Sequence, residues 1–182
     1  MNNMLEINGL QKTFNKGTIN QKLAIENLSL TFKEGDFVTV IGGNGAGKST
    51  LLNLIAGVYP ADAGQVILDG KDISKMPEHK RACLLGRVFQ DPMMGTAAGM
   101  GIEENLAMAY RRGKGRGLKW GISSRERAKY REKLQALDLG LEGRLSTKVG
   151  LLSGGQRQAL TLLMATLQKP RLLLLDEHTA AL

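Results

Sequence analysis

The residues with the clearest chemical potential are Gly42 to Ser49, GGNGAGKS, which follow the pattern G-x-x-x-x-G-K-[ST]. Glycines in this pattern let successive peptide N–H groups curl around phosphate oxygens, and a helix beginning near Lys48 adds its positive end. Lys48 can then reach the β- and γ-phosphates, and the Ser49 hydroxyl can coordinate Mg²⁺. The pattern predicts a nucleotide-phosphate site made of Gly42, Gly43, Asn44, Gly45, Ala46, Gly47, Lys48, Ser49 and Thr50.

Two adjacent acids, Asp176 and Glu177, follow the apolar run Leu172 to Leu175. A strand that is apolar on both faces is typical of the interior of a parallel sheet, and α/β folds bind ligands at the carboxyl ends of such strands. There, Asp176 could hold Mg²⁺ through water opposite Ser49, and Glu177 could polarise an attacking water as general base. The alternative for this dipeptide in isolation is a surface pair at a strand end.

The elements before the glycine loop are predicted to be strands. Alternating apolar residues predict strands within 4–14 and 23–41, with a hairpin turn at 33–36. The second stretch ends in a strand at 36–41, which leads into the glycine loop and then into an apolar helix at 51–57. A further strand is expected at 64–70. This order of strand, glycine loop and helix is the context that a phosphate site requires.

From about Gln90 to Leu152 the pattern becomes helical. Helical spacing of apolar residues predicts helices at 101–110 and 123–140, and the second has Ser123 and Glu126 placed as a capping box and Gly140 as its stop. After this insertion, a helix at 153–168 ends before Pro170, and a short strand follows at 171–176. The sequence therefore predicts an α/β fold with an inserted helical region.

Composition and charge set broad limits. With 42% hydrophobic and 23% charged residues, the chain is typical of soluble globular proteins. No apolar run reaches the roughly 18–20 residues that cross a bilayer, and the first ten residues do not match a secretion signal. The formal charge of +8, from 25 basic and 17 acidic side chains, suits an anionic partner.

Much of that charge lies in the basic segment, residues 111–133, which has ten basic and two acidic side chains. Three interpretations are open for it. It can be a solvated loop leading into a helix, a contact with a membrane subunit or anionic headgroups that also uses Trp120, or a nucleic-acid contact.

The stretch Leu151 to Gln158, LLSGGQRQ, followed by a helix and then by the acids at 176–177, resembles the signature of the ATP-binding cassette (ABC) ATPases. The resemblance implies that Phe14 stacks on adenine, although a core aromatic is the alternative. It also implies that Gln90 contacts Mg²⁺ and the attacking water, and that Glu177 is the catalytic glutamate. The resemblance further implies that four signature residues contact the γ-phosphate held by a second, head-to-tail subunit. These residues are Ser153, Gly154, Gly155 and Gln156.

The same resemblance implies one ABC ATPase domain over 1–182: a P-loop NTPase core with an antiparallel β-subdomain and an inserted helical subdomain. Its expected parts are the β-subdomain and P-loop core at 1–90, the helical subdomain at 91–152, and the signature helix and Walker B strand at 153–182. Family members continue into another strand and a switch histidine. We therefore expect the chain to be a fragment without its C-terminal part, which binds ATP weakly and hydrolyses it negligibly.

The implied function is an ATP-hydrolysing subunit that powers a bacterial membrane transporter, resembling importers assigned to tryptophan/tyrosine-type solutes. The implied cofactors are ATP and Mg²⁺. The expected partners are a second ATPase subunit, membrane-spanning permease subunits and a solute-binding protein, but no nucleic acid. The expected location is the cytoplasmic face of the membrane, through the permease. The alternatives are a non-hydrolysing ATP-binding module and a soluble ABC ATPase that acts on nucleic acid.

Overall fold

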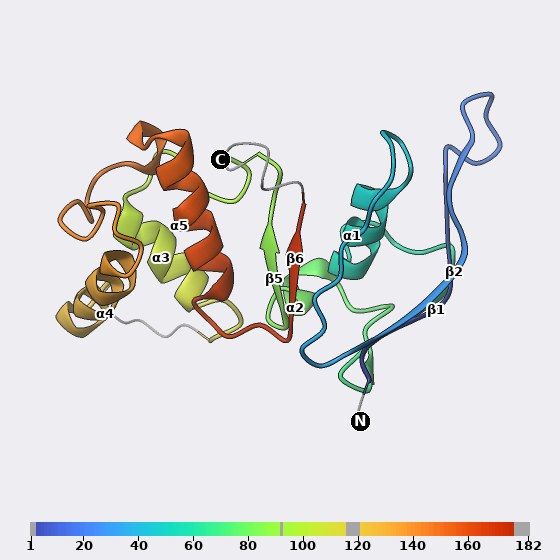
Figure 1. Ribbon diagram of the computed structural model, residues 1–182, viewed down its shortest axis with the longest axis horizontal. Helices are drawn as coiled ribbons and strands as arrows, with labels where there is room; N and C mark the ends of the chain where they lie inside the picture. The colour runs from blue at the N-terminus through green and yellow to red at the C-terminus, as the bar shows by residue number, and fades with distance from the viewer. Residues whose placement is uncertain (1–2, 92, 116–120, 177–182) are drawn as a thin grey trace. The chain divides into compact units, whose positions relative to one another are not determined.

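The computed structural model describes residues 3–91, 93–115 and 121–176, and the chain forms two compact units that divide between Leu84 and Leu85 (Figure 1). Each unit has its own sheet and its own helices.

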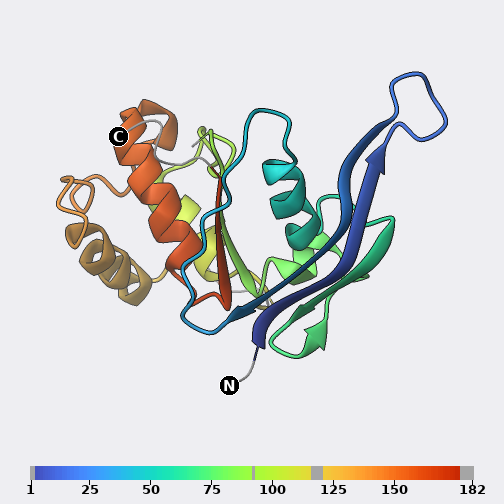
Figure 2. The ribbon, with the colours of Figure 1, turned by 45° about the vertical axis from the view of Figure 1, so that its right-hand side comes forward.

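The first unit is built on an antiparallel sheet with the strand order β2-β1-β3-β4. Leu5, Ile7 and Leu10 of β1 are buried, and β1 pairs with β2 on one side and β3 on the other. Figure 2 shows β1 and β2 running together as a long ribbon. The predicted antiparallel β-subdomain is thus confirmed. The strands are β1 (Asn3–Phe14), β2 (Lys22–Lys33), β3 (Ala63–Leu68) and β4 (Lys71–Asp72).

The helix after the glycine loop, α1 (Lys48–Ala56), buries Leu51 and Leu54. Its C-terminal end is held by Arg81, the last residue of α2 (Glu78–Arg81), which is only 3% exposed. The Arg81 guanidinium donates to the carbonyls of Leu54 and Ile55 at 2.8 and 2.9 Å. A cation at this end also complements the helix dipole. Burial lowers the pKa of Arg81 below its usual range.

The strand predicted at 36–41 is wrong. These residues have no regular secondary structure, and the side chains of Phe37 and Ile41 are each 90% exposed. An apolar stretch becomes a strand only when a neighbouring strand pairs with its peptide groups, and no described strand is hydrogen-bonded to 36–41. The predicted hairpin at 33–36 is therefore only a turn, closed by a hydrogen bond from the Asp36 N–H to the Lys33 carbonyl.

The second unit combines a parallel strand pair with a helical cluster (Figure 1). The short strand β6 is parallel to β5, as its apolar sequence predicts. Helix α3 packs on α4 and α5. The fully buried side chains of this cluster include Ile102, Leu106, Tyr130, Leu134, Leu141 and Leu160. The elements are β5 (Leu85–Val88), α3 (Ile102–Tyr110), α4 (Ser124–Gln135), the 3-10 helix η1 (Val149–Leu151), α5 (Gly154–Thr166) and β6 (Leu172–Leu175).

The capping box predicted at the start of α4 is confirmed, but the predicted stop at Gly140 is wrong. The Ser123 hydroxyl accepts from the Glu126 N–H, and the Glu126 carboxylate accepts from the Ser123 N–H at 2.8 Å. The helix ends at Gln135, and Asp138 then adopts a left-handed conformation with φ 53°. This early turn allows Leu141 to be fully buried in the helical cluster, so tertiary packing overrides the local stop signal.

Glu126 also pairs with Arg111 at 2.8 Å. The Ser123 N–H and then the Arg111 guanidinium lower the Glu126 pKa from 4.5 to about 2. Because the folded pKa lies below the unfolded one, this carboxylate stabilises the fold above the unfolded pKa. The contribution is lost as the pH falls through the folded pKa.

We predict that Glu126→Gln lowers the free energy of unfolding by about 1–2 kcal/mol at pH 7, because it loses a charged cap and an ion pair. The difference from the wild type should shrink between pH 4.5 and about 2. Urea unfolding at a series of pH values measures both effects. Glu132→Gln, an exposed position on the same helix, is the control, and an equal loss in both variants would contradict the prediction.

A second prediction concerns Gly47, which precedes α1 with φ 90°. A Cβ at this position would lie 2.7 Å from the Ala24 carbonyl oxygen of β2. Gly47→Ala should therefore lower the free energy of unfolding by about 1–3 kcal/mol, from left-handed strain and the clash with backbone. The control is Gly43→Ala, because a Cβ on Gly43 has no neighbour within 4 Å. Denaturant unfolding of both variants provides the test, and an unchanged midpoint for Gly47→Ala would refute it.

Candidate nucleotide site

The glycine loop curls ahead of α1 through two left-handed glycines, Gly45 (φ 80°) and Gly47 (φ 90°). One turn inside the loop is closed by the Ala46 N–H, which donates to the Gly43 carbonyl at 3.2 Å. Within the described residues, the N–H groups of Gly45 and Gly47 donate to no acceptor. Such groups at a helix N-terminus are suited to phosphate oxygens.

The Lys48 ammonium folds back over this loop. It donates to the carbonyl oxygens of Gly42 and Gly43 at 2.7 and 3.1 Å. The next residue, Ser49, is exposed on the first turn of α1. A cation and a hydroxyl are therefore both placed beside the loop, as the sequence pattern predicts.

The aromatic ring of Phe14, the last residue of β1, is partly exposed and is held on two sides. Tyr59 packs against it in a T-shaped arrangement, with ring centroids 5.3 Å apart and an interplanar angle of 82°. The Lys12 ammonium lies over the ring, 5.6 Å from its centroid. The ring thus has neighbours that fix its orientation without burying it.

Asp62 ties this end of β1 to the segment that follows α1. Its carboxylate accepts from the Thr13 N–H at 2.6 Å and pairs with Lys12 at 3.4 Å and with Lys16 at 3.2 Å. The Lys12 ammonium also donates to the Pro60 carbonyl at 2.7 Å. The Thr13 N–H, with the two lysines, lowers the pKa of Asp62. This group of contacts holds the backbone beside Phe14, and no sequence motif indicates it.

In the second unit, Gln90 and Asp176 follow the carboxyl ends of two paired strands. The last pair of the ladder is Val88 with Leu175, and the Asp176 N–H extends it by donating to the Val88 carbonyl at 3.1 Å. Gln90 is two residues beyond Val88 and is exposed. The two residues thus lie at the same edge of the strand pair. Glu177 lies outside the described residues.

The signature residues form the exposed N-terminus of α5. Ser153 is the N-cap, and its hydroxyl accepts from the Gln156 N–H at 3.2 Å, while the Gln156 side chain accepts from the Ser153 N–H. A Cβ on Gly154 or Gly155 would have no neighbour within 4 Å. Neither glycine is in the left-handed region, so packing within the described chain does not require glycine at these positions.

The sequence patterns did not predict two polar residues, one buried and one half-buried, that hold loops of the second unit in place. Asn105 of α3 is fully buried; its amide accepts from the Ala97 N–H at 2.8 Å and donates to the Gly101 carbonyl at 2.9 Å. Arg157 of α5 donates to the Leu152 carbonyl at 3.0 Å and contacts the Met93 sulfur. The signal for both would have been a polar residue at a core-facing helical position.

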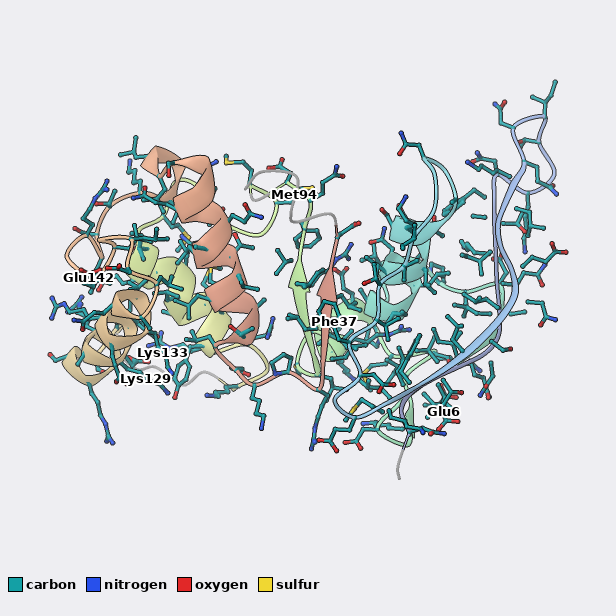
Figure 3. All side chains as sticks on the ribbon, in the orientation of Figure 1. Glu6, Phe37, Met94, Lys129, Lys133 and Glu142 are labelled. Atoms are coloured by element: carbon teal, nitrogen blue, oxygen red, sulfur yellow. The ribbon has the colours of Figure 1, made fainter. Side chains whose placement is uncertain are left out.

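The basic segment is partly neutralised in the structure. Arg111 pairs with Glu126, and Arg127 pairs with Glu103 at 2.7 Å. Lys114 and Lys129 both lie over the Tyr110 ring, 4.0 and 4.4 Å from its centroid. Figure 3 shows Lys129 and Lys133 on α4. These contacts pair part of the segment's charge locally, and residues 116–120, with Trp120, lie outside the described residues.

The donors present fit ATP and Mg²⁺. In the first unit, the N–H groups of Gly45 and Gly47 have no acceptor among the described residues, and the Lys48 ammonium lies over the same loop. The Ser49 hydroxyl of the first unit is a hard oxygen ligand of the kind that Mg²⁺ prefers, and so, in the second unit, are the Gln90 amide oxygen and the Asp176 carboxylate.

Comparison with known proteins agrees with this chemistry. The family model for "ABC transporter" matches residues 25–180. A tyrosine transport ATP-binding protein of Clostridioides difficile is 44% identical over 179 residues, which are 98% of this chain and 71% of that protein. A spermidine/putrescine import ATP-binding protein of Mannheimia succiniciproducens is 38% identical, and the chain spans only 43% of its length.

Solved structures show the same fold. A dimeric ATP-binding cassette in a post-hydrolysis state bound to ADP and Pi has a TM-score of 0.82 and 30% sequence identity, covering 98% of this chain and 76% of that one. A second cassette, in its ADP conformation, has a TM-score of 0.77 and 28% identity, covering 100% of this chain and 71% of that one. The predicted fold class is therefore confirmed. Given these matches, the chain belongs to the ABC transporter family, and its predicted assignment to the ATPase domain of that family is confirmed.

Proposed function

We propose that the protein carrying this sequence binds Mg-ATP at the glycine loop and hydrolyses it to drive a membrane transporter. The observation that carries this proposal is the loop geometry, with two left-handed glycines, free N–H groups within the described residues and the Lys48 ammonium folded over them. The ligand contacts are assigned to Gly42 through Thr50, with Phe14 stacking on the adenine. In this arrangement Lys48 neutralises charge on the β- and γ-phosphates.

For the hydrolytic step, we assign Glu177 as the general base and Gln90 as a residue that orients the attacking water. The edge shared by Gln90 and Asp176 supports this assignment, because both side chains follow paired strand ends. Ser49, Gln90 and Asp176 would hold Mg²⁺, which when bound supplies charge neutralisation at the phosphates. Glu177 directly follows Asp176 in the sequence, and its assigned role requires its carboxylate to come within hydrogen-bond reach of the water.

The signature is assigned to a second subunit's nucleotide. Gly154 and Gly155 have open space around them, which leaves room for a group from outside the described chain to approach the start of α5. A helix N-terminus with a serine cap suits a phosphate oxygen. A head-to-tail dimer, in which Ser153, Gly154, Gly155 and Gln156 face the γ-phosphate on the other copy, satisfies this requirement. The solved relative bound to ADP and Pi is itself dimeric.

The transport partner is assigned from the relatives and from the surface. Relatives are named as ATP-binding proteins of tyrosine transport and of spermidine/putrescine import, which supports an importer of a small solute with permease subunits and a solute-binding protein. Among the described helices, none is long and apolar enough to cross a bilayer. Met93 and Met94, which follow Gln90 by three and four residues, are exposed and offer an adaptable apolar contact for a permease at the membrane surface (Met94 is labelled in Figure 3).

We predict separate effects for the binding and the hydrolytic residues. Lys48→Ala should remove most ATP binding, because it deletes the cation at the β- and γ-phosphates. Glu177→Gln should keep ATP binding but lower turnover by roughly 10²-fold or more, the effect of losing a positioned base. Equilibrium titration with ATP and steady-state phosphate release measure the two steps. Parental turnover in Glu177→Gln would show that Glu177 is not the base.

For the dimer, we predict that Gly155→Asp prevents ATP-dependent self-association without unfolding the chain. The new carboxylate meets open space in the monomer but would oppose the γ-phosphate of the second subunit. Sedimentation with ATP, in the Glu177→Gln background to slow hydrolysis, measures the association. Gly143→Asp, also at an open glycine, is the matched control. Association of Gly155→Asp at the level of this control would exclude the proposed contact.

A further inference from the structure

Lys22 is a cation beside the nucleotide site to which neither the glycine-loop pattern nor the signature assigns a role. It is the first residue of β2 and is exposed. In the register of the sheet it lies opposite Phe14, the last residue of β1. Lys22 is therefore adjacent to the ring that is proposed to stack on adenine.

The Lys22 side chain extends from there to the glycine loop. A Cβ built on Gly45 would lie 3.4 Å from the Lys22 ammonium nitrogen, and Gly45 is one of the two left-handed glycines of the loop. Two residues further along β2, the Ala24 carbonyl is in close contact with Gly47. The start of β2 thus runs along the glycine loop, and the Lys22 ammonium points to the part of the loop that precedes Lys48.

The positions of these groups follow the order of the parts of a nucleotide. Phe14 is at the base and Lys48 at the β- and γ-phosphates, so the ribose and α-phosphate must pass between them. Lys22 is next to Phe14 through the sheet and next to Gly45 through its ammonium group. We propose that Lys22 binds the α-phosphate of the nucleotide through a charge-assisted hydrogen bond; this inference rests on the nucleotide site proposed above.

A contact with the α-phosphate has a kinetic signature. ATP and ADP share this phosphate, and hydrolysis changes neither its charge nor its bonds. The contact therefore contributes equally to both nucleotides and to the transition state, so its loss raises KM and leaves kcat unchanged. This behaviour differs from that expected of Lys48, whose partners include the γ-phosphate.

The test is equilibrium titration of the protein with ATP and with ADP, together with steady-state ATPase kinetics. Lys22→Met should weaken both nucleotides by the same factor, about three- to tenfold at low salt, the range for a partly exposed charged hydrogen bond. The difference should decrease as salt is added. Lys22→Arg, which keeps the charge, should bind like the wild type. The matched control is Lys33→Met, which removes the same charge from the other end of β2.

Each outcome decides the inference. Wild-type affinity in Lys22→Met, while Lys48→Ala loses ATP, would overturn the role of Lys22 and leave the nucleotide site intact. Weakening of ATP alone would exclude the α-phosphate, and equal weakening in Lys33→Met would assign the effect to net charge instead of a local contact. A folded wild type that binds neither nucleotide would overturn the proposed function and this inference with it.

Discussion

The close approach of Gly47 to the Ala24 carbonyl is the contact on which the first unit's arrangement depends. It places the start of α1 directly against β2, and no side chain can be added there without moving one of the two backbones. Since β2 is paired with β1 in a fixed register, the same contact sets where Phe14 lies with respect to the glycine loop. Asp62 and Arg81 then hold the two ends of this assembly by hydrogen bonds to backbone groups.

In the second unit, the corresponding constraint is the parallel pairing of β5 with β6. Because parallel strands end at the same edge, pairing Val88 with Leu175 is enough to bring Gln90 and Asp176 together. Asn105 and Arg157 stabilise the loops that follow, through bonds to backbone carbonyls. The candidate site residues of both units are thus positioned by main-chain contacts; Ser49 and Gln90 are exposed, whereas Lys48 and Asp176 are half-buried.

The sequence correctly predicted the structural features that depend on residues close together in the chain. The cap at Ser123, the helix at 101–110 and the alternating strands β1 and β2 depend on residues within a few positions of one another. The predictions that were wrong concern features that depend on residues far away in the sequence. The strand expected at 36–41 lacks a paired neighbour among the described strands, and the stop expected at Gly140 is replaced by a turn that buries Leu141. For the site in the first unit, the glycine loop was predictable from spacing, whereas Lys22 and Asp62 were not, because only the folded chain brings them beside Phe14.

Some glycines of this chain are required by the backbone conformation and others are not, and the sequence alone does not distinguish the two kinds. Gly47 is required by the fold, since its φ is left-handed and a backbone carbonyl lies where its Cβ would be. Gly154 and Gly155, the first two residues of α5, have neither constraint. Without side chains there, a phosphate can approach the N–H groups of the helix N-terminus closely. The open glycines of α5 therefore suit the proposed contact with a phosphate on a second subunit. The glycines of the glycine loop suit the proposed phosphate site of the same subunit.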